Sequence, residues 1–124
     1  MRIFKTNWFQ KWATSEGLTD ESLRTAVREM AQGLIDADLG GHVVKKRVAL
    51  PGRGKRGGSR TLVAFEHERC AFFIYGFAKN VRANVSQKEF KALKRLAQEM
   101  LGYSDPALSK ALRVAELIEV KIDG

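Results

Sequence analysis

The stretch from Lys45 to Arg60 holds the residue types that most clearly point to chemistry. It contains seven Lys or Arg residues in sixteen positions and no Asp or Glu. Its centre, Pro51–Gly58, is expected to form a flexible loop between two apolar, β-branched runs, where glycine lets a bulky partner approach the backbone closely. Such a density of cations suits a polyanion. A solvated basic hairpin is the alternative, but solvated faces usually mix both signs of charge. The basic side chains are Lys45, Lys46, Arg47, Arg53, Lys55, Arg56 and Arg60.

Length and composition favour one domain over residues 1–124. The net charge of +8 favours RNA, DNA or an acidic protein as partner, through long-range attraction. The single cysteine, Cys70, cannot form an internal disulfide and fits a reduced, cytoplasmic setting. There is no Cys/His cluster with metal-ligand spacing, so neither metal nor cofactor is expected. The start of the chain lacks the features of a signal peptide, and no apolar run approaches the roughly 20 residues of a membrane helix, so no membrane partner is expected.

Hydrophobic periodicity predicts an α+β domain in the order βα, α, βββ, αα. The predicted helices begin at Asn7, Thr19, Ser86 and Asp105, and Ser86 with Glu89 has the pattern of a capping box. We expect a small antiparallel sheet covered by helices on one face, with the other face open for a site. The predicted strands are Arg2–Lys5, Val43–Leu50, Ser59–Glu66, Arg69–Lys79 and a short edge strand within 116–122.

Alternation along the second predicted strand separates its basic side chains. Lys45 and Arg47 are expected on one face, and Lys46 on the other with the apolar residues of the strand. In the first predicted helix, Phe9 and Trp12 share a face three residues apart. The aromatic group around them, which includes Trp8, is interpreted as core in preference to a base-stacking platform.

Three motifs in order resemble a known family. They are Lys-x-Arg, Gly-x-Gly-Lys-x-Gly-Gly-x-Arg and Phe-Ala-Lys-Asn, at Lys45 with Arg47, at Gly52–Arg60 and at Phe77–Asn80. Together with the capped Leu/Lys-rich helix that follows, they resemble the RelE/HigB-type toxins of bacterial type II toxin–antitoxin systems, in the RelE/ParE superfamily. The likeness runs from about Leu34 to Leu101, and weakly to both ends.

The resemblance implies a RelE-like fold of the microbial RNase type. It also implies an endoribonuclease, an mRNA interferase that cleaves messenger RNA on the ribosome and inhibits translation until neutralised by a small antitoxin with a DNA-binding domain. The sequence departs from related toxins at Arg56, where they usually have serine, and Tyr103 is the only candidate for a tyrosine near the end. Some relatives with this fold poison DNA gyrase, so a gyrase-directed toxin or a basic nucleic-acid-binding module remains an alternative.

RNA cleavage by its own 2′-hydroxyl needs a base, a cation that stabilises the phosphorane, and an acid for the leaving oxygen. The two histidines, His42 and His67, are interpreted as incidental, which leaves lysine and arginine. Crowded positive charges lower the pKa of a lysine, so Lys45, Lys55 and Lys79 are candidate bases or acids. Arg47 and Arg60 suit a transition-state phosphate, because guanidinium binds it bidentately. As an exposed cation near the loop, Arg60 is expected to add little stability.

The remaining candidates would bind RNA without taking part in the reaction. Tyr75 and Phe77 are expected on the strand face that carries Lys79, where they either stack a base or pack in the core. Three further arginines are expected to steer phosphates: Arg53, Arg56 and Arg82.

Overall fold

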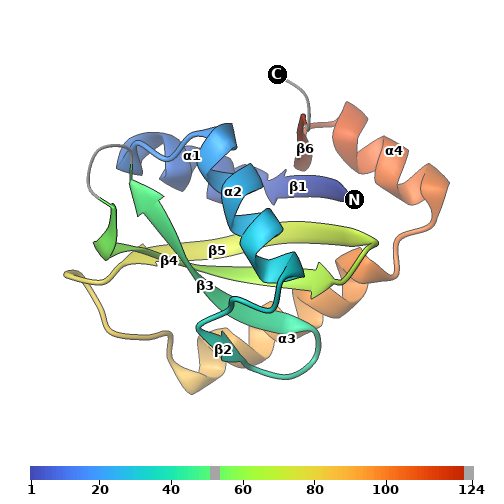
Figure 1. The fold of residues 1–124 in the computed structure, drawn as a ribbon. Helices are drawn as coiled ribbons and strands as arrows, with labels where there is room; N and C mark the ends of the chain where they lie inside the picture. The colour runs from blue at the N-terminus through green and yellow to red at the C-terminus, as the bar shows by residue number, and fades with distance from the viewer. Residues whose placement is uncertain (51–53, 122–124) are drawn as a thin grey trace.

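A computed structural model describes residues 1–50 and 54–121, without the side chains of 54–57. It shows one open sheet with four helices (Figure 1). In chain order the elements are β1 (Arg2–Thr6), α1 (Asn7–Glu16), α2 (Asp20–Ala31), β2 (Ala37–Asp38), β3 (Val43–Leu50), β4 (Gly54–Glu66), β5 (Cys70–Ala78), α3 (Gln87–Leu101), α4 (Asp105–Arg113) and β6 (Leu117–Val120). The predicted α+β class is confirmed, and β2 is a strand that the sequence did not reveal.

The six strands lie in the order β2-β3-β4-β5-β1-β6. β3, β4 and β5 form an antiparallel meander, as consecutive strands joined by short connections commonly do. β6 is the expected edge strand and runs antiparallel to β1. β1 itself runs parallel to β5, so the expectation of an antiparallel sheet fails at this one pair. No short turn joins β1 to β5, so local chain geometry does not impose an antiparallel pairing there.

Helices cover both faces of the sheet, and the expectation that they cover only one is wrong. α2 crosses the near face in Figure 1 while α3 passes behind the sheet. The two apolar clusters share the strands by alternation: Ile3, Val63 and Phe73 pack with α1 and α2, whereas Phe4, Leu62 and Phe72 pack with α3 and α4. The physical reason is the continuous apolar run of β5, which places large side chains on both of its faces and requires cover on each.

Side-chain caps fix the residue at which each helix begins after the preceding strand or loop. Thr19 caps α2, and Ser86 with Glu89 forms a capping box at α3, as predicted. α1 and α4 are capped by Thr6 and Ser104, one residue earlier than expected. Because Thr6 also ends β1, the chain enters α1 without a loop, and the first turn of α1 lies beside β5. Among the described helices, none combines the length and apolar character that a bilayer crossing requires.

The register of the meander decides which side chains meet. β4 begins at Gly54, five residues earlier than predicted, so the expected loop at Pro51–Gly58 is largely strand. Arg47 on β3 pairs with Arg60 on β4, and Arg60 pairs with Phe77 on β5. These residues face the α3 side of the sheet. On β3, Val48 beside Arg47 belongs to the cluster under α1 and α2, whereas Leu62, two residues from Arg60 on β4, and Tyr75, two residues from Phe77 on β5, belong to the cluster under α3 and α4.

Candidate active site

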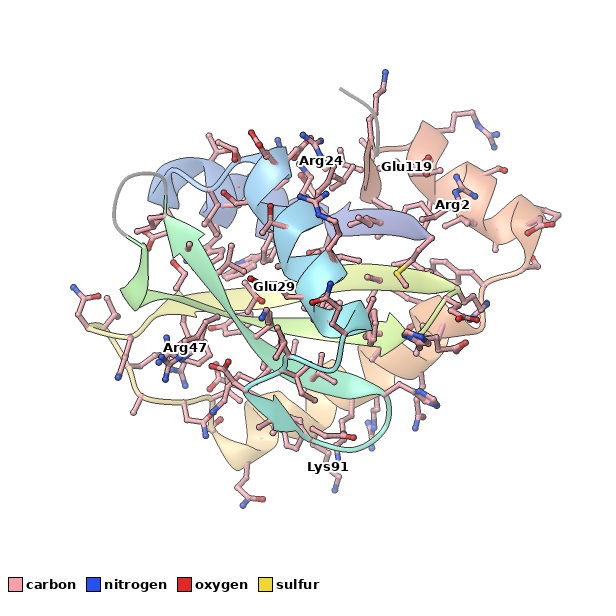
Figure 2. The ribbon with its side chains drawn as sticks, in the orientation of Figure 1. Arg2, Arg24, Glu29, Arg47, Lys91 and Glu119 are labelled. Atoms are coloured by element: carbon pink, nitrogen blue, oxygen red, sulfur yellow. The ribbon has the colours of Figure 1, made fainter. Side chains whose placement is uncertain are left out.

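An open pocket of about 370 Å³ lies on this face, at the end of the meander that α3 leaves uncovered. Four of the five predicted catalytic residues line it. Figure 2 shows Arg47 at this end of the sheet, beside the segment that follows β5. The lining residues are Asp36, Lys45, Arg47, Arg60, Lys79 and Ala83.

The strand register explains why these cations converge. Arg47 and Arg60 are directly opposite one another on adjacent strands, so their side chains leave the sheet side by side. Lys45 is two residues before Arg47 on β3, and Lys79 is two residues after Phe77, the partner of Arg60 on β5. The two lysines therefore flank the arginine pair from opposite sides along the strand direction.

A carboxylate that the sequence did not point to holds the two arginines. Asp36 Oδ2 accepts a hydrogen bond from Arg47 Nε at 3.2 Å and lies 3.5 Å from Arg60 Nε. The backbone N–H of Asp36 donates to the carbonyl of Lys45 at 2.8 Å, which fixes the segment before β2 against β3. One carboxylate thus offsets the repulsion between two neighbouring guanidinium groups and orients both.

Arg60 is buried, which overturns the expectation of an exposed cation. Only 8% of its side chain is accessible, compared with 46% for Arg47. Its Nη1 finds no hydrogen-bond partner among the described residues. A buried N–H group without an acceptor costs about 1–3 kcal/mol, so such groups are rare unless a ligand completes them.

Lys46 belongs to the opposite face, as the alternation predicted. Its ammonium group lies 2.9 Å from Glu29 Oε1 and donates to the carbonyl of Leu34 at 2.8 Å. Only 3% of the residue is accessible. Figure 2 shows Glu29 on α2, the helix in front of the sheet in this view. Lys46 therefore ties α2 to β3 and takes no part in the pocket, so the basic stretch divides into a structural face and a candidate active face.

Comparison with known proteins agrees with this arrangement. Residues 1–120 match the family model described as the RelE toxin of the RelE / RelB toxin-antitoxin system. The chain belongs to the RelE toxin family. It is therefore the toxin of a toxin–antitoxin system, with a cognate antitoxin as its partner. The sequence matches none of the curated proteins with which it was compared.

In this RelE-family toxin, Arg82 is engaged by a neighbour. Its Nη1 and Nη2 donate to the two carboxylate oxygens of Glu89 at 3.0 and 2.6 Å, and its Nε donates to the carbonyl of Asn84 at 2.8 Å. The Arg82 guanidinium, helped by Ser86, lowers the pKa of Glu89 from 4.5 to about 2. Arg82 thus anchors the start of α3 and does not line the pocket, and its role as a phosphate-steering residue stays a prediction.

The two predicted stacking residues differ in their surroundings. Phe77 is 3% exposed and packs in the core. It is the β5 partner of Arg60, which lines the pocket. Tyr75 is half-buried and stacks on Trp8 of α1, with 4.6 Å between ring centroids and 17° between ring planes. Trp8 itself is 47% exposed, so its interpretation as core is wrong.

Other candidates lie elsewhere or outside the described residues. Arg53 and the side chains of Lys55 and Arg56 fall outside the described part of the chain, and their roles stay predictions. Tyr103 lines a different pocket beside Cys70, where burial raises its pKa, and it does not border Arg60. Both histidines line a separate pocket under α2. Within residues 1–50 and 54–121, no group of three or more His, Cys, Asp or Glu could hold a metal ion.

Proposed function

We propose that this toxin is an endoribonuclease that cleaves messenger RNA on the ribosome and so inhibits translation. The observation that carries the proposal is the buried guanidinium of Arg60, whose Nη1 has no acceptor among the described residues, beside Arg47 in a pocket flanked by two lysines. A phosphate is the acceptor that matches this geometry, because paired guanidinium groups bind its oxygens bidentately.

The reaction would use the RNA's own 2′-hydroxyl as nucleophile. One lysine, Lys45 or Lys79, takes the 2′ proton as the 2′ oxygen forms a bond to the adjacent phosphorus. The bond from phosphorus to the 5′ oxygen then breaks, and the other lysine donates a proton to that oxygen. The products are a 2′,3′-cyclic phosphate and a 5′-hydroxyl. Flanking positions suit the two lysines to these roles, because attack and departure occur on opposite sides of the phosphorus.

Asp36 would act as a positioning residue. Both of its described arginine contacts are made through Nε. The terminal Nη groups of the two arginines are then directed at the substrate while their Nε groups stay on the carboxylate. Preorganised donors of this kind stabilise developing phosphorane charge without having to reorient during the reaction.

The same pocket offers a simple means of control. A net charge of +8 attracts ribosomal and messenger RNA, and it also attracts an acidic segment of an antitoxin. We propose that the cognate antitoxin silences the toxin by covering the arginine pair. Co-expression of the antitoxin would then abolish the RNA cleavage that the next experiment measures.

Capture of 5′-hydroxyl RNA ends after brief induction in a bacterial host tests the proposal. Discrete new ends within translated regions are expected with the wild-type toxin, and far fewer with Arg60→Gln. Lys110→Gln on α4 is the matched control, since it removes the same charge from an exposed site away from the pocket. Intact messenger RNA accompanied by broken chromosomes would overturn the proposal and assign the toxin to gyrase.

A further inference from the structure

Four aromatic rings form a continuous row from the surface of α1 to the pocket. We name this row the aromatic ladder: Trp12, Trp8, Tyr75 and Phe77. Trp8 and Trp12 lie nearly parallel, with 6.2 Å between centroids and 8° between planes. Trp12 packs against the core under α1, whereas nearly half of Trp8 is open to solvent.

The aromatic ladder adjoins the pocket that Arg47 and Arg60 line, because its last two rings lie on β5, the strand next to Arg60. Tyr75 pairs with Leu62 and Phe77 pairs with Arg60, so Tyr75 and Arg60 are diagonal neighbours on the same face. Diagonal neighbours on adjacent strands lie about 7–8 Å apart. Lys79 directly follows the last residue of β5 and lines the pocket together with Arg60. The row of rings therefore ends where the proposed scissile phosphate would sit.

We propose that Trp8 and Tyr75 form a nucleobase subsite, in which Trp8 stacks an unpaired base of the RNA whose phosphate occupies the pocket. This inference rests on the proposed function for the identity of the ligand. Base stacking on an aromatic ring tolerates any sequence, because every base has a flat π face. It also requires a base free of its duplex partner, so the subsite favours single-stranded over double-stranded nucleic acid.

Two features of Trp8 support a ligand-binding role over a purely structural one. Its stack on Tyr75 holds the ring in one orientation, which reduces the entropy lost when a base binds. Its exposed fraction of 47% is far above that of Phe9, the next residue on α1, which is fully buried. A tryptophan kept for packing alone is expected to be covered, because exposing its surface forfeits burial free energy.

The test measures binding of a short single-stranded DNA oligonucleotide, which has no 2′-hydroxyl and cannot be cleaved by the proposed route. Trp8→Ala should weaken binding about 5- to 100-fold, the range expected for loss of one base–aromatic stack. Trp8→Phe should recover most of the affinity because it keeps a ring. Val114→Ala is the matched control, as an exposed apolar residue at the end of α4, and should change nothing.

An abasic oligonucleotide provides the second arm of the test. Removing one base, at the position that contacts Trp8, should weaken binding to the wild-type toxin by a similar factor. The same removal should have no further effect on Trp8→Ala, because the stacking partner is already gone. Thermal unfolding of each variant beforehand ensures that the comparison is made between folded proteins.

The outcomes separate this subsite from the proposed function. Equal binding of all oligonucleotides by wild type and Trp8→Ala would overturn the subsite, even if RNA cleavage is found. Loss of antitoxin binding in Trp8→Ala, with oligonucleotide binding unchanged, would also overturn it and make Trp8 a protein-docking residue. Trp8-dependent oligonucleotide binding in a toxin that produces no 5′-hydroxyl ends would overturn the nuclease proposal and leave the subsite standing.

Discussion

Replacement of Arg60 by alanine should reduce both the stability of the fold and the rate of RNA cleavage, by amounts that can be worked out separately. The variant loses a charged contact to Asp36, worth about 1.5–3 kcal/mol. It also loses two buried methylenes, Cγ and Cδ, because alanine keeps Cβ, and each is worth about 0.8 kcal/mol. Against these losses, removal of Nη1, which has no acceptor within the described part of the chain, relieves about 1–3 kcal/mol. The net destabilisation is about 2 kcal/mol.

That loss leaves the protein folded. A domain of this kind unfolds with a free energy of about 5–15 kcal/mol, so more than about 99% of the molecules remain native. The melting temperature should fall by roughly 5–10 °C. Cleavage should fall at least about 100-fold, as it does when one donor to a charged transition state is removed. Unfolding cannot account for so large a decrease in rate, so the two effects are distinguishable.

Two companion variants sharpen the comparison. Arg47→Ala should lower the cleavage rate by a similar factor and the melting temperature much less, because the Arg47 side chain is 46% exposed. Arg60→Lys should restore only part of the activity, since an ammonium group cannot bind a phosphate bidentately. The assays are single-turnover cleavage of messenger RNA on programmed ribosomes and thermal unfolding followed by circular dichroism.

Two results would refute the reasoning. A folded Arg60→Ala toxin with undiminished cleavage would remove Arg60 from the site. The mechanism would then lack its buried hydrogen-bond donor to the phosphate. A larger drop in melting temperature for Arg47→Ala than for Arg60→Ala would contradict the stability argument, because that argument depends on the burial of Arg60.

Four further predictions follow from other contacts. Asp36→Asn should lower the cleavage rate about 10-fold or more, because the two arginines are no longer held in one orientation. RNA binding should not weaken, since the substitution removes a negative charge from the pocket. An equal loss of RNA affinity would argue against a positioning role. Glu89→Gln should lower the melting temperature at neutral pH, and the gap should close as pH falls from 4.5 towards 2, because a depressed pKa stabilises the fold only above that window. Gly76→Ala should destabilise the fold by about 1–3 kcal/mol in denaturant titrations, because its Cβ would collide with the Trp12 ring. RNA affinity should fall steeply with rising salt, and a flat dependence would exclude the cationic pocket as the binding surface.

Local pattern was sufficient to predict most of the framework. The period-2 alternation of β3 separated Lys45 and Arg47 from Lys46 correctly, because side chains on a strand must alternate between faces. The predicted antiparallel sheet places the end of β3 beside the start of β4, and Arg47 pairs with Arg60 there. Ser86 and Glu89 correctly predicted the start of α3, because a capping box involves only residues that are close in the sequence.

Tertiary structure alone decided what surrounds each cation. Asp36 reaches Arg47 and Arg60 only because the segment before β2 lies along β3, and nothing in its local sequence marks it as their partner. Glu89 accepts two hydrogen bonds from the guanidinium of Arg82, a pairing that was not predicted from the sequence. The burial of Arg60 likewise depends on neighbours that are distant in the chain.

The same reason explains the misjudged faces of the fold. An apolar run predicts that a strand is covered, and it does not say which helices cover it, so α3 and α4 were expected on the same side as α1 and α2. Helical spacing correctly predicted that Phe9 and Trp12 share a face. The exposure of Trp8 depends instead on the position of α1, which begins directly after β1 and lies beside β5. Residue type and spacing determined which groups could bind a phosphate, and three-dimensional packing determined which of them remain available for it.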